Sequence, residues 1–136
     1  MSLGKWLTLL FLVVSVGFVC FLSWKKDPDL GTLSWMPSFI AEWGDLSEND
    51  TLRTGVPFIG MAVVIGIYLL RYDNFTVFNV VLAWLAMVLL IIFVELVQYF
   101  IPTRYSDFRD VLWAGAGAAF GFLIITIFKN IIPNRP

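Results

Sequence analysis

Residues 75–128 read FTVFNVVLAWLAMVLLIIFVELVQYFIPTRYSDFRDVLWAGAGAAFGFLIITIF, in which two long apolar runs flank a short polar segment. The first run, Phe75 to Phe100, contains one formally charged residue, Glu95, and the second, Val111 to Phe128, contains none. A helix that crosses a bilayer needs about 20 predominantly apolar residues, so each run is long enough to span a membrane. A connection this short makes the two helices antiparallel neighbours, which predicts a transmembrane hairpin.

The composition of the whole chain excludes a soluble domain. Of its 136 residues, 60% are hydrophobic and 14% are charged, whereas an average soluble chain has roughly 25% charged residues. A domain of this size in water exposes too much of its surface to bury that much apolar area. The net charge of −1 leaves no basic face for nucleic acid, so we expect none as a partner. We expect residues 1–136 to form a single transmembrane domain.

Two further apolar runs precede the hairpin. The run from Trp6 to Ser23 follows a lysine, as in a signal peptide, but it exceeds the usual apolar length of about 7–15 residues and no small-residue cleavage site follows. We therefore expect a retained anchor helix. The run from Val56 to Leu70 is short, and we expect the helix to begin earlier, near Glu48.

The start of this second spanning helix is predicted from capping residues. Ser47 is a good N-cap and Asp50, three positions later, fits a capping box, so the helix should extend to Arg71. Pro57 should kink it where it enters the apolar zone. The alternative is a re-entrant segment that does not cross the membrane.

The long connection before this helix is rich in acidic residues but has an aromatic centre. Phe39, Ile40 and Trp43 share one helical face, and Trp35 lies just before them. Because tryptophan favours the membrane–water interface, we predict a short interfacial helix, with a lipid-sensing or partner-binding segment as the alternative. The predicted fold class is therefore an all-α polytopic membrane protein, with four transmembrane helices and a short interfacial helix between the first and second.

Four spans place both termini on the same side of the membrane. Lysine and arginine are split four against five between the two sides, so the positive-inside rule does not decide the orientation. The acid-rich connection favours the outer side, and we expect both termini to be cytoplasmic.

The hairpin carries a cluster of polar residues at one membrane face. A carboxylate within a span costs about 2.5–3.5 kcal/mol on insertion scales, so Glu95 should be paired, hydrogen-bonded or protonated. Gln98 lies on the same helical face, and Arg104 is near enough in sequence to fold back over it. We predict a contact network of Glu95, Gln98 and Arg104, closed by Asp107 or Asp110. Asp107 and Asp110 also have the spacing of an N-cap and its third helical residue.

The last span contains a small-residue face. Gly117 and Gly121 form a GxxxG pair, with Gly115 beside them, and small residues let helix backbones approach closely in lipid. We predict that this face packs against the third spanning helix and holds the polar cluster rigid.

The hairpin resembles the VanZ-like family of small membrane proteins, whose signature is a Glu, a Gln three positions later, an Arg, two spaced Asp, an Asn and a glycine-rich helix. The positions that match in order and spacing are Glu95, Gln98, Arg104, Asp107, Asp110, Gly117 and Gly121. Pro57 to Gly60 is similar to a Pro-x-x-Gly pattern of the family. The family's Asn falls on Ala114, and the His that many members carry in the second helix is absent. The resemblance implies a bacterial inner-membrane protein connected with the cell envelope and with glycopeptide (teicoplanin) resistance.

Two classes of function remain open. The first is a non-enzymatic accessory or scaffold subunit, bound in the bilayer to a membrane-protein partner or a second copy. The second is a cell-envelope enzyme or a lipid- or glycopeptide-interacting protein, with Glu95, Arg104 and Asp110 as candidate catalytic residues. In that case Arg104 could hold a phosphate or a carboxylate, and Asp107 with Asp110 a hard cation. The chain has no histidine, which removes the usual zinc and haem ligands, and we expect no resident metal or cofactor.

Overall fold

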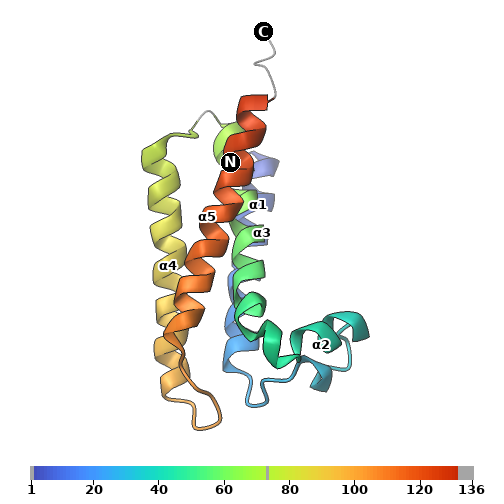
Figure 1. Cartoon of the computed structure of the whole chain (residues 1–136). Coiled ribbons are helices and arrows are strands. Elements are labelled where there is room, and N and C mark those ends of the chain that lie inside the picture. Colours follow the sequence, from blue (N-terminus) through green and yellow to red (C-terminus); the bar gives the residue numbers. More distant parts are fainter. Residues whose placement is uncertain (1, 73, 132–136) are drawn as a thin grey trace.

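The computed structural model describes residues 2–72 and 74–131, which form helices and connections without a strand. The elements are α1 (Leu3–Trp24), η1 (Leu30–Thr32), α2 (Ser38–Gly44), η2 (Ser47–Asn49), α3 (Asp50–Arg71), α4 (Val77–Tyr99) and α5 (Phe108–Ile131), where η marks a short 3₁₀ turn. The four long helices run side by side, and α2 projects from the end of the bundle opposite the chain termini (Figure 1).

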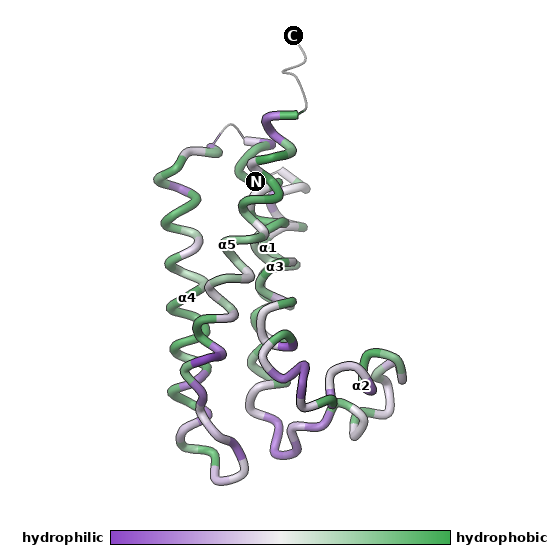
Figure 2. Tube along the Cα trace, in the orientation of Figure 1, coloured by the Kyte–Doolittle hydropathy of each residue, from purple (hydrophilic) through white to green (hydrophobic). Residues whose placement is uncertain are grey.

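The predicted fold class is confirmed. All four long helices have the length and apolar composition of a membrane span, and α2 lies where the short interfacial helix was expected. Hydrophilic residues gather at the end of the bundle that carries α2 and the α4–α5 connection, while the helix bodies are mostly hydrophobic (Figure 2). This end of the bundle is called the loop end below.

The predicted cap of the second span is wrong in detail. Ser47 lies inside η2 rather than capping a helix, because the chain makes a separate 3₁₀ turn before α3 begins at Asp50. The side chain that stabilises this turn belongs to Asn49, whose Nδ2 donates to the Trp43 carbonyl at 2.7 Å. Pro57 lies within α3, which continues as one helix to Arg71 and so favours a span over a re-entrant segment.

The closest helix pair in the bundle is α3 with α5, and glycine makes it possible. A Cβ added at Gly117 would lie 2.4 Å from the Gly55 carbonyl oxygen, and one added at Gly121 would lie 2.6 Å from that of Ile59. Both obstacles are backbone atoms, which cannot move aside as a side chain can. The prediction that this small-residue face packs against the third span, α4, is therefore wrong for Gly117 and Gly121, because α3 presents its own small residues there.

Gly115 does face α4, as predicted. Its nearest neighbours are Val88 and Trp84, at ordinary van der Waals distances. The Trp84 indole Nε1 donates to the Gly115 carbonyl at 2.8 Å, so a side chain of α4 bonds directly to the backbone of α5. The two faces of α5 thus use different means of contact, which are backbone proximity toward α3 and a side-chain hydrogen bond toward α4.

The core of the bundle lies between α3, α4 and α5, and α1 is peripheral. The core is formed mainly by Phe58, Met61 and Ala62 of α3, Met87, Ile91 and Val94 of α4, and Ala114, Ala118 and Phe122 of α5. By contrast, α1 has one buried residue, Val19. Its end is attached to α4 by two hydrogen bonds, from the Trp24 indole to the Val94 carbonyl at 3.3 Å and from the Gln98 amide to the Ser23 carbonyl at 3.1 Å.

Candidate functional site

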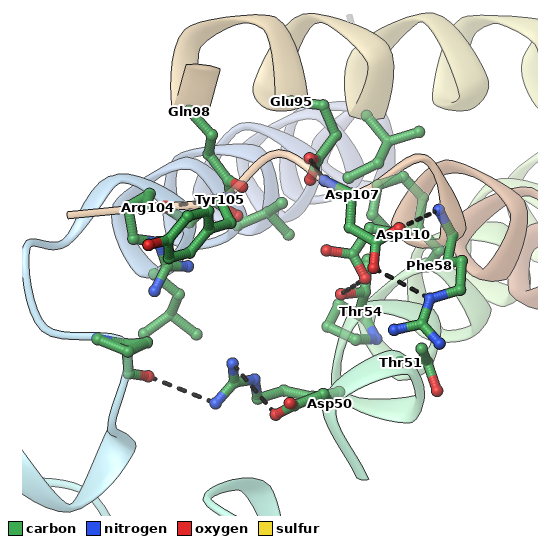
Figure 3. Close-up of a pocket in the computed structure, with 18 of the residues that line it drawn as sticks. Asp50, Thr51, Thr54, Phe58, Glu95, Gln98, Arg104, Tyr105, Asp107 and Asp110 are labelled. Carbon is green, nitrogen blue, oxygen red and sulfur yellow. Dashed lines mark hydrogen bonds and ion pairs between the residues drawn. The ribbon is translucent and has the colours of Figure 1, made fainter. Parts of the chain in front are cut away.

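A cavity of about 310 Å³ opens at the loop end of the bundle, among α1, α3, α4 and α5. Its apolar wall is formed by side chains such as Phe18, Val19, Phe58 and Ile91. Its polar wall includes Glu95, Gln98, Arg104, Asp107 and Asp110, the five residues that the sequence grouped, together with Asp50, Arg53, Thr54 and Arg109. Figure 3 shows these side chains converging from several helices and from the α4–α5 connection.

Glu95 fixes the start of α5 to α4. Its side chain is 5% exposed, and its Oε2 accepts a hydrogen bond from the backbone N–H of Asp107 at 2.9 Å. The residue therefore meets the expectation that a carboxyl in a span must be hydrogen-bonded. The partner is a main-chain group in the connection rather than a charged side chain.

The predicted network of Glu95, Gln98 and Arg104 does not form as a set of direct contacts. Among the described residues, no lysine or arginine nitrogen lies within 4.0 Å of the Glu95 carboxylate. Gln98 is buried, but its amide turns toward α1 and bonds to Ser23. The reason is geometric, because the connection returns its backbone, and not the Arg104 side chain, to the Glu95 face.

The two aspartates at the start of α5 have different partners. The Asp107 carboxylate accepts from the backbone N–H of Arg109 at 2.8 Å and from its Nε at 3.0 Å, so the predicted N-cap role is confirmed. These two hydrogen bonds, the backbone one first, hold the pKa of Asp107 below its ordinary value. Asp110 instead faces α3, where its Oδ1 accepts the Thr54 hydroxyl at 3.1 Å.

Two guanidinium groups, those of Arg53 and Arg104, face the cavity from different elements. Arg53 is in the first turns of α3, and its ion pairs with Asp45 and Asp50 are long, at 3.8 Å each. Its Nη1 also donates to the Gly44 carbonyl at 3.1 Å and to the Pro28 carbonyl at 3.3 Å. In the described part of the chain, no carboxylate oxygen comes within 4.0 Å of the Arg104 guanidinium. Burial, and then the nearby charge of Arg53, lower the pKa of Arg104. Two half-buried cations that repel each other across a cavity form a place where an anion would be stabilised.

Sequence reasoning missed the contribution of α1 and α3 to this site. Arg53, Thr54 and Ser23 come from segments that the hairpin motif does not include. Their only signal was a position at the edge of an apolar run, since Ser23 ends the first run and the other two residues lie within one turn before the second. Thr54 bonds α3 to α5 and Ser23 bonds α1 to α4, while Arg53 donates to the Pro28 and Gly44 carbonyls. A pattern confined to residues 95–121 cannot reveal these links. Ala114, at the position of the family's Asn, is fully buried in the core and is not part of the cavity wall.

The part of the chain that the structure describes adds no further metal ligand to Asp107 and Asp110, the pair considered for a hard cation. The described residues contain no group of three or more His, Cys, Asp or Glu side chains placed to hold a metal ion. Asp107 is already engaged by Arg109 and Asp110 by Thr54. The arrangement therefore suits recognition of an organic polar group better than coordination of a hard cation.

The interfacial residues predicted from the sequence are exposed on the surface of the protein. Trp35, Phe39, Ile40 and Trp43 are all exposed, with Phe39 at 72%. The Trp35 ring contacts α1, since its centroid lies 6.2 Å from that of Phe18. The role of these residues at a bilayer surface or against a partner stays a prediction.

The fold and the site together define a multi-pass α-helical membrane protein with a mixed polar and apolar cavity at one end of its bundle. Comparison with family models matches VanZ/LLP1 over residues 5–129, and the chain belongs to the VanZ/LLP1 family. The match covers all four spans and not the hairpin alone. No curated protein and no solved structure gave a significant match.

Proposed function

We propose that this membrane protein binds the phosphate-bearing headgroup of a lipid in the loop-end cavity, without transforming it. The observation that carries the proposal is the convergence of Arg53 and Arg104 on a cavity whose inner wall is apolar. Arginine presents a planar fork of donors that matches phosphate oxygens, and it is less strongly hydrated than lysine. An amphiphile would place its phosphate between the guanidiniums and its first methylenes against Phe18, Phe58 and Ile91.

The size of the cavity supports a headgroup rather than a whole lipid. Pockets for small ligands are typically about 300–1,000 Å³, and this one, at about 310 Å³, is at the lower limit. The acyl chains would therefore continue into the bilayer beside the helices. A membrane position for the cavity mouth agrees with the hydrophilic residues at this end of the bundle (Figure 2).

Lipid titration of the purified full chain tests the proposal. Native mass spectrometry in detergent would measure the binding of dioleoyl-phosphatidylglycerol to the unaltered chain and to Arg104→Gln, Arg53→Gln and Lys26→Gln. Hydrogen bonds to a charged group are each worth about 1.5–3 kcal/mol, so loss of either cavity arginine should weaken binding about tenfold or more. Lys26 is an exposed cation on the same side of the bundle and outside the cavity, so its substitution should change little. Equal binding by Arg104→Gln and the unaltered chain would refute the proposal.

An accessory or scaffold role is a second candidate, favoured by the apolar side chains that α2 holds away from the bundle. If the protein is a scaffold, Phe39, Ile40 and Trp43 contact a partner protein. If it binds lipid, they contact the surface of the bilayer. Quenching of tryptophan fluorescence by lipid-depth probes separates the two. Quenching in vesicles of the purified chain supports the bilayer. If the tryptophans are protected from these probes only when a stoichiometric partner protein is retained through purification, the scaffold role is supported.

A catalytic role is the remaining alternative, with Glu95 as acid or base and Arg104 and Asp110 around it. It requires turnover of an envelope lipid or glycan, abolished by Glu95→Gln in a folded protein. In all three readings we propose a bacterial plasma-membrane protein with both termini cytoplasmic. Cysteine accessibility at residue 2 compared with residue 29, measured from outside intact cells, would test that orientation.

A further inference from the structure

The cavity has a second chemical feature besides its arginines, namely carboxylates without a cationic partner. Glu95 accepts the Asp107 N–H, and Asp110 accepts the Thr54 hydroxyl, both neutral donors. In the part of the chain that the structure describes, neither carboxylate has a lysine or arginine nitrogen within 4.0 Å. Figure 3 shows Asp110 and Arg104 on opposite sides of the cavity.

The charges of the cavity wall do not balance internally. Arg109 pairs with Asp107, and Arg53 makes long pairs with Asp45 and Asp50. Among the described residues, these contacts leave the Arg104 guanidinium and the carboxyls of Glu95 and Asp110 without an ion pair within 4.0 Å. A ligand with only a negative charge would be attracted by Arg104 and repelled by the two carboxylates, since like charges close together are unfavourable in a low-dielectric site. A ligand with both charges removes this conflict.

We infer that the ligand is an aminophospholipid, with its phosphate at Arg104 and Arg53 and its primary ammonium at Glu95 and Asp110. The inference rests on the proposed function and specifies the class of lipid. An ammonium group offers three donors, enough to bond both carboxylates, whereas choline carries its charge without an N–H and glycerol has no charge. A divalent cation fits less well, because Ca²⁺ takes six to eight oxygen ligands and the described residues provide no cluster of three acidic groups.

The test compares three lipids that differ only in the headgroup. Dioleoyl-phosphatidylethanolamine, -phosphatidylcholine and -phosphatidylglycerol would be titrated onto the purified full chain by native mass spectrometry. We expect the ethanolamine lipid to bind about tenfold more tightly than the other two, a difference typical of one charge-assisted hydrogen bond. Equal binding of the three, or a preference for phosphatidylglycerol, overturns the inference while the phosphate proposal survives. This comparison needs no variant, so misfolding cannot obscure it.

Variants then identify the side chains that bind the ammonium group of the lipid. Glu95→Gln and Asp110→Asn keep an oxygen acceptor for Asp107 and Thr54 but lose the negative charge, so the fold should be retained. Together they should abolish the preference for the ethanolamine lipid over phosphatidylglycerol. The matched control is Glu42→Gln, an exposed acid outside the cavity, which should keep the preference. A preference that survives in the folded double variant contradicts the assignment of the amine to these carboxyls. If instead Arg104→Gln leaves the binding of all three lipids unchanged, the proposed function itself fails.

Discussion

Helices α5 and α1 are both spans of similar length, yet they are held in the bundle by opposite means. Along α5, glycines bring the backbone against α3, and seven of its residues, from Ala114 to Ile125, are buried. Along α1, Val19 is the one buried residue, and nothing lies within 4 Å of a Cβ added at Gly17. The difference shows that apolar composition brings a helix into a membrane, whereas small residues at matched positions decide which helices become a rigid unit.

The largest expected effect comes from breaking the α3–α5 contact. Gly117→Ala places a methyl group against the Gly55 carbonyl, which has to move, and we expect destabilisation by about 1–3 kcal/mol, the usual cost of overpacking. Thermal unfolding in a mild detergent would measure it. Gly17→Ala is the matched control on α1, where the added methyl meets open space and helix propensity improves. A Gly117 variant as stable as the Gly17 variant would contradict the account of this interface.

The attachment of α1 to α4 should be weaker than the α3–α5 contact, and its loss should affect a smaller part of the bundle. In Gln98→Leu the Ser23 carbonyl loses its donor, and we expect a loss of about 0.5–1.5 kcal/mol confined to the end of α1. Hydrogen exchange of the amides at the end of α1, compared with those of α5, would localise the change. Uniform acceleration of exchange across the bundle would show that α1 is not a separately held element.

Acid should affect the start of α5 through Asp107. The pKa of this residue is held below its ordinary value of 3.8 by the hydrogen bonds from Arg109, so its ionised form stabilises the folded state. That contribution is fully present above the ordinary value and is lost as the pH falls through the lower folded value. The unaltered chain should therefore be slightly more stable than Asp107→Asn at neutral pH, and the difference in Tm should shrink as the pH falls below about 4. A difference that is constant with pH would mean that the charge of Asp107 has no role.

The smallest expected effect on stability is that of Arg104. Since no carboxylate is within 4.0 Å of its guanidinium in the described chain, Arg104→Gln should change the free energy of unfolding by less than about 0.5 kcal/mol. The comparison with Gly117→Ala would sharpen the contrast between residues that hold the bundle together and a residue that is available to a ligand. A strong loss of Tm in Arg104→Gln would indicate a structural role for this residue instead.

The four spans were predictable because each follows from a property of consecutive residues. An apolar run of sufficient length forms a helix in a membrane whatever its neighbours are, so α1, α4 and α5 begin and end close to the runs that predicted them. The Asp107 cap is local in the same sense, since the carboxylate and its donor on Arg109 are two residues apart.

Apart from the Ser47 cap, which failed because a separate 3₁₀ turn precedes α3, the errors concern which side chain meets which partner. The GxxxG pair predicts a close helix contact but does not identify the partner helix. The partner is α3, because its small residues Gly55 and Ala62 leave room for a close approach, whereas α4 presents the bulky Trp84 and Val88. Charge and proximity in sequence suggested a Glu95–Arg104 pair, but the path of the α4–α5 connection gives Glu95 the Asp107 N–H instead.

The primary structure alone thus specified a membrane protein of four helices and the polar residues gathered at the end of its hairpin, because hydrophobicity, helix length and capping act over short distances along the chain. The tertiary structure decided that α3 supplies Arg53 and Thr54 to that end, and that Arg104 is left facing a cavity rather than an anion. These relations join residues up to 56 positions apart, such as Thr54 and Asp110, and they depend on how closely whole helices approach, which no local pattern encodes.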